Sequence, residues 1–561
     1  MTLLSRCTPS PDKLLKAPSS CSLSFILALL RACKATRHLQ QVHSRIVRKG
    51  LEQDHFIITH FICFCNSLRN LLYATTVFNR VLKPSLYLWN CLIKGQCDHS
   101  SAAATFTVFV RLKRSETAPD KFTFPSLIKA CSNECAKREG MVVHGLTMRC
   151  GLDDDVFVRT SLIDFYGKCR GIECARKLFD GMHEKNEVSW TAMIVGYVNA
   201  GDVAEATKLF DEMPRRNIVS WNAMIGGFVK FGDLRSARRL FDEMPERNVV
   251  SFTVMIDGYA KAGDMASARL LFEQSPSVDI IAWSALISGY ARNGQPNEAV
   301  KIFFEMGLRN VKPDEFIMVS LMSACSQVGD LELAKWVDSY LDRSSIDLHR
   351  AHVAAALVDM NAKCGNMERA AKLFEEMPRR DVISYCSMMQ GLSMHGRGAE
   401  AVCLFARMLN EGLTPDDVAF TVVLTACSHA GLVEEGYFYF DTMISDYCIV
   451  PSPDHYACMV DLLGRSGRLE AAYELIKSMP VEPHAGAWGA LLGACKLHGN
   501  IELAEVVAGR LFELEPHNAS NYVLLSNIYA AADQWLDVSL LRDTMKERAL
   551  RKIPGCSWIH L

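Results

Sequence analysis

The sequence lacks any apolar run long enough to cross a membrane. A membrane-spanning helix needs roughly 18–20 consecutive apolar residues, and the stretch FILALL at 25–30 is far shorter. The sequence therefore predicts no association with a membrane.

The sequence also lacks Cys-x-x-Cys pairs, although it contains 21 cysteines. Their absence argues against a structural zinc site and against a disulfide framework. Many of the cysteines recur in short motifs: Cys131, Cys325, Cys427 and Cys495 in Ala-Cys-Ser or Ala-Cys-Lys, and Cys169 and Cys364 in Lys-Cys-Gly. We therefore predict free thiols that act as packing residues in a reducing compartment, with no metal and no cofactor.

What the sequence does have is an internal repeat. Trp190, Trp221, Phe252 and Trp283 recur every 31 residues in near-copies of one motif, such as EVSWTAMIVGY and IVSWNAMIGGF. Apolar residues within each copy fall at helical spacing, and a Gly-Asp pair at 201–202 separates two such helices. One helical hairpin cannot bury both apolar faces alone, so neighbouring hairpins must stack. We predict an all-α superhelical solenoid of helix-turn-helix repeats of 31–36 residues.

The repeats come in three types. Short repeats end in Phe-Asp-Glu-Met-Pro or a close variant, as at 210–217, 241–248 and 374–381. Repeats of about 35 residues run on to a later proline, as at 311–316, or carry Ala-Cys-Ser in the first helix. We place the repeats at 55–85, 86–120, 121–155, 156–186, 187–217, 218–248, 249–279, 280–314, 315–350, 351–381, 382–416, 417–452 and 453–483, after a degenerate one at 20–54.

This alternation of short, standard and long repeats resembles that of plant pentatricopeptide repeat (PPR) proteins, in the subclass that mixes all three lengths. The motifs VSWNAMIGG, DMNAKCGNMERAAKLFEEMP and HYACMVDLLGRSGRLEAA carry the resemblance, and residues 483–558 resemble the E-type C-terminal extension of that subclass. The resemblance implies a right-handed superhelix, with a repeat array at 20–483 and an E-type extension of helical hairpins at 484–561. It also implies binding of single-stranded RNA in an organelle, most often to choose a cytidine for C-to-U editing.

The near-balance of charge allows two interpretations. Lys and Arg number 61 against 63 Asp and Glu, which argues mildly against indiscriminate binding of polyanions. The chain then either forms a neutral scaffold or carries a groove of positive potential beside acidic outer faces. Arginine clusters at 213–217, 244–248 and 377–381 fit the groove, but arginines at helix ends also complement the helix dipole.

The first fifty residues have one acidic residue, Asp12, against nine basic ones. A basic, hydroxylated and acid-poor composition is typical of organellar transit peptides. We predict a transit peptide at 1–19 and prefer the mitochondrion over the chloroplast. The alternative is a disordered tail before the first repeat.

Residues that recognise RNA bases are expected at two positions in each repeat. Arrays of this family read one base per repeat with two or three side chains. The resemblance assigns this role to the residue after the aromatic of the first helix and to the last residue of the same repeat. The resulting base-reading pairs are Asn90/Asp120, Thr160/Asn186, Thr191/Asn217, Asn222/Asn248, Thr253/Asp279 and Ser284/Asp314. The alternative is that these hydroxyls, amides and carboxylates cap helices.

The family's rule translates these pairs into bases. Asn with Asp implies U, Thr or Ser with Asp implies G, Thr with Asn implies A, and Asn with Asn implies a pyrimidine. With one base left open for the repeat at 121–155, the chain is expected to read 5′-U-n-A-A-Y-G-G-3′. The pairs Val319/Arg350, Ala355/Asp381, Cys386/Asp416 and Thr421/Ser452 depart from the rule and leave the later bases unassigned.

Catalytic motifs are missing. A zinc-dependent cytidine deaminase needs an HxE and a PCxxC motif, and the sequence contains neither, nor a Walker loop or a nucleophile elbow. We therefore expect no enzyme and no catalytic residue. The resemblance implies partners in trans, namely a deaminase-bearing PPR protein and multiple organellar RNA editing factors. The E-type hairpins are the expected docking surface, or they only cap the solenoid.

Two alternative functions are also compatible with the sequence. One is an organellar RNA-binding factor for splicing, stability or processing without editing. The other is a protein-binding scaffold like tetratricopeptide arrays, whose period is a constant 34 residues. Polar pairs and the mixed repeat lengths favour RNA.

Overall fold

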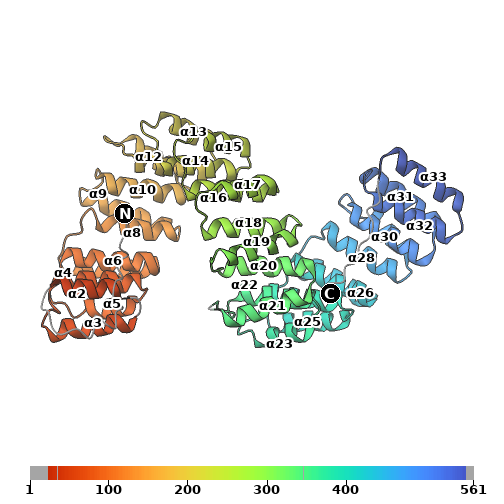
Figure 1. Cartoon of the computed structure of the whole chain (residues 1–561), viewed down its shortest axis with the longest axis horizontal. Helices are drawn as coiled ribbons and strands as arrows, with labels where there is room; N and C mark the ends of the chain where they lie inside the picture. Colours follow the sequence, from red (N-terminus) through yellow and green to blue (C-terminus); the bar gives the residue numbers. More distant parts are fainter. Residues whose placement is uncertain (1–22, 34–35, 345, 551–561) are drawn as a thin grey trace, which may run out of the picture. The chain divides into compact units, whose positions relative to one another are not determined.

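Only helices occur as regular elements in the residues that the computed structural model describes, 23–33, 36–344 and 346–550 (Figure 1). Successive helices pair into hairpins, and the hairpins stack one on the next. The predicted all-α solenoid of helical hairpins is confirmed. The predicted transit peptide at 1–19 lies outside the described residues, as does the end of the E-type extension at 551–561.

The chain divides into two compact parts. The N-terminal part comprises Met1–Ala262 with Leu270–Ser277, and the C-terminal part comprises Gly263–Arg269 with Val278–Leu561. Helix α17 (Met265–Gln274) contributes residues to both parts.

The N-terminal part contains α2 to α16. Their bounds are α2 Leu23–Ala32, α3 Thr36–Arg48, α4 His55–Ser67, α5 Leu71–Phe78, α6 Leu86–His99, α7 Ala102–Arg114, α8 Thr123–Asn133, α9 Lys137–Arg149, α10 Val156–Lys168, α11 Ile172–Asp180, α12 Glu187–Ala200, α13 Val203–Glu212, α14 Ile218–Lys230, α15 Leu234–Glu243 and α16 Val249–Ala262.

The C-terminal part contains α18 to α33. Their bounds are α18 Ile280–Arg292, α19 Pro296–Leu308, α20 Glu315–Val328, α21 Leu331–Arg343, α22 Ala351–Lys363, α23 Met367–Glu376, α24 Val382–Met394, α25 Gly398–Asn410, α26 Asp417–Ala430, α27 Val433–Ser445, α28 Pro453–Arg465, α29 Leu469–Lys477, α30 Ala485–His498, α31 Ile501–Leu514, α32 Ala519–Ala531 and α33 Trp535–Glu547.

Each repeat placed from the sequence holds two helices. The first, which we call the A helix, has an even number, and the second, the B helix, has an odd number. The hairpin α12–α13 shows how the residues set the ends. The Asn186 side chain caps the start of α12, and Gly201 ends it in the left-handed conformation at φ 93°. Asp202 then caps α13, which ends before Pro214 because proline cannot continue a helix.

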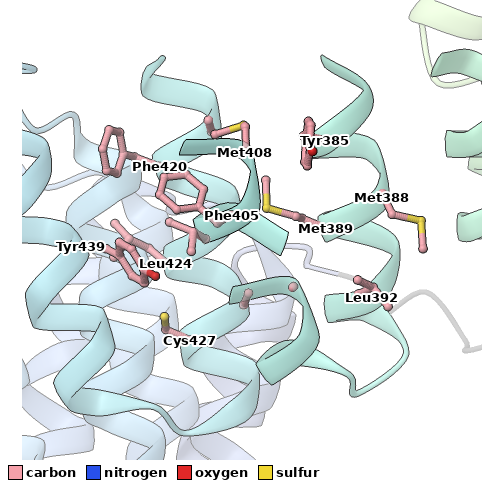
Figure 2. Packing of buried hydrophobic residues seen from close by; sticks show 14 of the residues in the cluster. Tyr385, Met388, Met389, Leu392, Phe405, Met408, Phe420, Leu424, Cys427 and Tyr439 are labelled. Atoms are coloured by element: carbon pink, nitrogen blue, oxygen red, sulfur yellow. The ribbon is translucent and has the colours of Figure 1, made fainter. Parts of the chain in front are cut away.

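Aromatic pairs join several B helices to the next A helix. Phe210 of α13 meets Trp221 of α14 edge-on, with ring centroids 4.9 Å apart, and Phe374 of α23 meets Tyr385 of α24 at 5.0 Å. Figure 2 shows the same packing one repeat on, where the ring of Phe405 lies against Phe420 and Tyr439. We call the position of Trp190, Trp221 and Tyr385 in each A helix the anchor position. The repeated aromatic of the sequence therefore holds neighbouring hairpins together.

The recurrent cysteines are packing residues, as predicted. Cys131, Cys325, Cys427 and Cys495 are fully buried, and Cys427 lies in the cluster of Figure 2. Burial raises the pKa of the Cys427 thiol to about 12. These thiols therefore stay protonated and behave as small apolar groups.

Candidate nucleic-acid interface

Consecutive A helices of the N-terminal part line a groove of about 520 Å³. The groove is formed by residues of α6, α8, α10 and α12 and by the start of α14. Three predicted base-reading residues, Thr160, Thr191 and Asn217, lie in its wall. The A helices can pack closely because glycines face the neighbouring helix: a Cβ on Gly227 of α14 would lie 2.8 Å from Val198 of α12.

The pair Asn90/Asp120 is joined by a direct hydrogen bond. Asn90 follows the anchor Trp89 on α6, and its Nδ2 donates to Asp120 Oδ1 at 3.0 Å. The Thr123 hydroxyl donates to Asn90 Oδ1 at 2.8 Å and thereby fixes the orientation of the amide. Burial raises the pKa of Asp120, but hydrogen bonds from Thr123 and Asn90 outweigh it, so the pKa lies below its usual value. The site therefore presents a fixed amide beside an ionised carboxylate.

The pair Asn222/Asn248 has the same geometry. Asn222 follows the anchor Trp221 on α14, and its Nδ2 donates to Asn248 Oδ1 at 3.2 Å. Asn222 Oδ1 is buried and accepts no hydrogen bond within the described residues. An unsatisfied buried acceptor costs about 1–3 kcal/mol, so this atom is suited to a donor supplied by a ligand.

Two threonine pairs lie on the same face without a direct bond between their members. Thr191 donates its hydroxyl to the Glu187 carbonyl at 2.7 Å, and Asn217 Nδ2 donates to the Glu187 carboxylate at 3.0 Å. In the pair Thr160/Asn186, the Thr160 hydroxyl lines the groove and is buried without a hydrogen-bond partner in the described structure. Thr160, Thr191 and Asn217 thus line the groove, whereas Asn186 lines a separate hollow with Glu187 and Val188.

The last two pairs are Thr253/Asp279 and Ser284/Asp314. The Thr253 hydroxyl donates to the Val249 carbonyl at 2.9 Å, and Ser284 is half-buried on α18. Asp279 accepts from the Ala282 amide at 2.8 Å, and Asp314 accepts from the Ile317 amide at 2.9 Å. Each of these carboxylates caps its own helix.

The helix-cap interpretation is therefore correct for the second residue of four of the six pairs. Asn186, Asn217, Asp279 and Asp314 are N-caps whose side chains accept from the first turn. In the asparagines the cap uses Oδ1 and leaves the Nδ2 group to point elsewhere, as the Asn217–Glu187 contact shows. Capping and contact with a ligand are thus compatible in the same residue.

A row of exposed apolar residues was missed in the sequence. It lies two residues before the anchor position of the A helices and comprises Tyr87, Phe122, Phe157, Val188, Val219 and Val250 in the N-terminal part, and Ile281, Phe316, Ile383 and Val418 in the C-terminal part. These side chains are 49–68% exposed, and Val188 and Val219 line the groove. Exposed apolar groups repeated beside polar pairs offer apolar surface against which the faces of bases can pack.

One arginine of each cluster is held at the end of a B helix and is not among the residues that line the groove. Arg216 donates through Nε to the Phe210 carbonyl at 3.0 Å, and its guanidinium lies 4.6 Å from the centroid of the Phe210 ring. Arg247 and Arg380 repeat this contact with Phe241 and Phe374. These three arginines close the ends of their B helices, as the helix-dipole alternative predicted.

Two lysines supply positive charge in the groove instead. Lys94 and Lys129 both line it. Lys129 pairs with Asp98 at 2.8 Å, whereas Lys94 is exposed and has no carboxylate within 4.0 Å among the described residues. Lys94 is therefore free to meet a phosphate. Within the described residues no cluster of three or more His, Cys, Asp and Glu side chains is placed to hold a metal ion, and no helix there is both apolar and long enough to span a membrane.

The fold and the groove define an α-solenoid with polar pairs on the inner helices, and comparison with known sequences identifies its family. PPR repeat profiles match residues 157–187, 185–219, 219–249, 250–277, 278–327, 355–382, 380–429, 418–448 and 454–482, and an E motif profile matches 498–560. The chain belongs to the pentatricopeptide repeat family.

Several relatives match along nearly the whole chain. Pentatricopeptide repeat-containing protein At5g37570 of Arabidopsis thaliana is 60% identical over 96% of this chain and 98% of its own length. Protein At3g29230 of the same plant is 48% identical over 95% of this chain and 89% of its own length. Among solved structures, maize PPR10 in complex with an 18-nucleotide psaJ RNA element has a TM-score of 0.52 at 16% identity, covering 96% of this chain and 95% of that chain. That likeness shows a common fold.

Proposed function

We propose that this protein binds single-stranded organellar RNA in a sequence-specific manner through its six base-reading pairs. One observation carries the proposal: Asn90/Asp120 and Asn222/Asn248 each join an A helix to the boundary of the next repeat by a hydrogen bond between the two side chains. Both asparagines follow the anchor, where a packing role would favour an apolar residue. The solved maize relative, which is named as a complex with RNA, supports the same use of the fold.

The groove explains how an unpaired strand would be held. Exposed valines flank the polar pairs and offer apolar surface to the faces of the bases, while Lys94 offers a charge to the phosphate backbone. The polar pairs then distinguish bases by their hydrogen-bonding edges. The expected site is 5′-U-n-A-A-Y-G-G-3′.

We further propose that the bound RNA contains a cytidine that is edited to uridine. The E motif at 498–560 is the feature that supports this role. Because the sequence contains neither HxE nor PCxxC, the deaminase would act in trans, carried by another PPR protein together with multiple organellar RNA editing factors. The proposed compartment is the mitochondrion, reached through a transit peptide at 1–19. The chloroplast is the alternative, and two relatives are named as chloroplastic.

Sequencing organellar transcripts from plants without this protein tests the editing role. The proposal predicts the loss of one or a few C-to-U events near a copy of the derived site, with restoration by the wild-type gene. A defect in splicing or transcript abundance with all editing intact would select the processing alternative. Wild-type transcripts in both respects would contradict a role in RNA.

A further inference from the structure

Two cysteines of neighbouring A helices lie in contact. Cys63 of α4 and Cys91 of α6 have their sulfur atoms 3.5 Å apart. Cys63 is exposed and Cys91 is half-buried, so solvent reaches the pair. Both are free thiols.

The two helices are held close at this point by a specific contact. Gly95 of α6 has no side chain, and a Cβ there would lie 2.2 Å from the Asn66 amide of α4. That amide instead donates to the Cys91 carbonyl at 3.0 Å. The thiols therefore lie in contact because Gly95 and Asn66 allow the two helices to pack closely at this point.

The pair lies on the base-reading face. Cys91 is two residues after the anchor Trp89, and its equivalents Ser126, Ser161 and Ala192 all line the groove. Cys63 aligns with Lys94, five residues after the anchor, which also lines the groove. Cys91 directly follows the predicted reader Asn90.

The surroundings favour thiol chemistry. The hydrogen bond with Cys91, together with His60 and Lys94, outweighs the effect of burial and lowers the pKa of Cys63. The same contact raises the pKa of Cys91. Cys63 is the more exposed of the two thiols, so it is the sulfur that a dissolved disulfide reaches first, and its lowered pKa favours the nucleophilic thiolate.

We propose that Cys63 and Cys91 form a redox-active dithiol that a small-molecule disulfide such as oxidised glutathione converts into a bond between α4 and α6. The Cys63 thiolate attacks one sulfur of oxidised glutathione, forms a mixed disulfide and releases one glutathione thiolate, which takes up a proton. Cys91 then loses its proton and attacks Cys63 Sγ, forming the intramolecular bond and releasing the second glutathione. Two protein thiols are oxidised, and one oxidised glutathione is reduced to two thiols.

Closure alters the base-reading face. The sulfurs must approach from 3.5 Å to about 2.05 Å, and the new bond ties Cys91, which directly follows Asn90, to α4. Oxidation therefore weakens RNA binding at the first predicted base, a consequence that rests on the proposed function. The formation of the disulfide does not depend on the proposed function.

Thiol trapping and peptide mapping of the full chain, without RNA, test the dithiol. The protein is equilibrated with reduced and oxidised glutathione at several ratios, alkylated and mapped by mass spectrometry. A Cys63–Cys91 linked peptide should accumulate as the oxidised fraction rises, persist in the control Cys150→Ser, and be lost in Cys63→Ser. Gly95→Ala should lower its yield by spreading the helices. Glutathione adducts without closure, or both thiols remaining alkylatable throughout, would overturn the proposal.

The RNA consequence is tested separately. Oxidised wild type should bind the derived heptamer about threefold or more weakly than reduced wild type, and Cys63→Ser should show a ratio near one. Equal affinity of the two wild-type forms, with the linked peptide present, would overturn the coupling. A reduced protein that shows no RNA preference would instead contradict the proposed function and leave the mapping result standing.

Discussion

Repeats 86–314 and repeats 315–452 share one hairpin architecture but differ at the position that follows the anchor. Earlier repeats place Asn90, Thr191 or Asn222 there. Three of the four later repeats place Val319, Ala355 or Cys386 there, and the fourth keeps Thr421. The residue at the repeat boundary varies less, because Asp381 and Asp416 still cap α24 and α26.

This difference separates the boundary position, which serves the structure of the hairpin, from the position after the anchor, which is proposed to distinguish bases. A boundary Asp or Asn can cap the next helix whether or not RNA contacts it, as Asp381 and Asp416 do. The residue after the anchor has no such duty, so apolar groups replace it without harm to the hairpin. At Cys386, burial raises the pKa of the thiol to about 12, with Asp416 and Asp381 adding to the rise. Under the proposed function, the information about bases therefore depends mainly on the residue after the anchor.

The largest expected effect tests whether both regions have the same architecture. Trp221→Ala and Tyr385→Ala each remove a ring packed edge-on against a phenylalanine. Each should lower local stability by about 3–5 kcal/mol. Hydrogen exchange of peptides from α14 and α24 measures the loss of local stability. A large loss in only one of the two variants would show that the two regions do not share one architecture.

The next effect changes a base in the earlier repeats. Asn222→Thr combined with Asn248→Asp should move the preference of that repeat from a pyrimidine to G. The change should be worth about 1–3 kcal/mol, as for base contacts in general. Fluorescence anisotropy with the four heptamers that differ at this position measures it. An unchanged order of affinities would reject the assignment of the pair.

The converse change adds a reader to the later repeats. Cys386→Thr, with Asp416 retained, should create a Thr/Asp pair and a new preference for G, since the boundary carboxylate is already in place. Affinities for longer RNAs that vary at the matching position measure it, with Cys403→Ser as the control for loss of a thiol. Indifference to that base would show that a polar pair alone does not make a reader.

A smaller effect concerns charge. Lys94→Ala should weaken binding to all sequences alike and reduce the salt dependence of the affinity by about one phosphate contact. Lys129→Ala is the matched control and should change less, because its ammonium already pairs with Asp98. A sequence-dependent loss in Lys94→Ala would place that lysine on a base.

The smallest expected effect is on the pH dependence of thermal stability, through the carboxylate of Asp120. Its folded-state pKa is lowered, so the ionised carboxylate contributes stability above the usual pKa of about 3.9 and loses it as pH falls through the lower native value. The difference in melting temperature between wild type and Asp120→Asn should stay constant from pH 7 to about 5 and shrink below about 4. A difference that vanishes above pH 5 would contradict the Asn90–Asp120 contact.

The features that recur with the repeat were predictable from the sequence. The contacts that depend on how a turn or a pair of helices comes together in space were not. The 31-residue recurrence of Trp190, Trp221 and Trp283 marks the hairpins because helical packing repeats with the sequence. Arg216 is ambiguous in the sequence, since only the three-dimensional turn shows that it reaches the Phe210 carbonyl. Val188 and Val219 recur at 31 residues as well, but an apolar residue near a helix start looks like core until its exposure is seen. Cys63 and Cys91 meet only because Gly95 brings two helices together.

Binding of the full chain to the derived heptamer 5′-U-n-A-A-Y-G-G-3′ and to a scrambled version, at moderate salt, tests the account most directly. Stacked hairpins that read bases through their polar pairs predict at least about tenfold tighter binding to the derived sequence, with each base contact contributing roughly 1–3 kcal/mol. Equal affinity for the two RNAs would contradict the account.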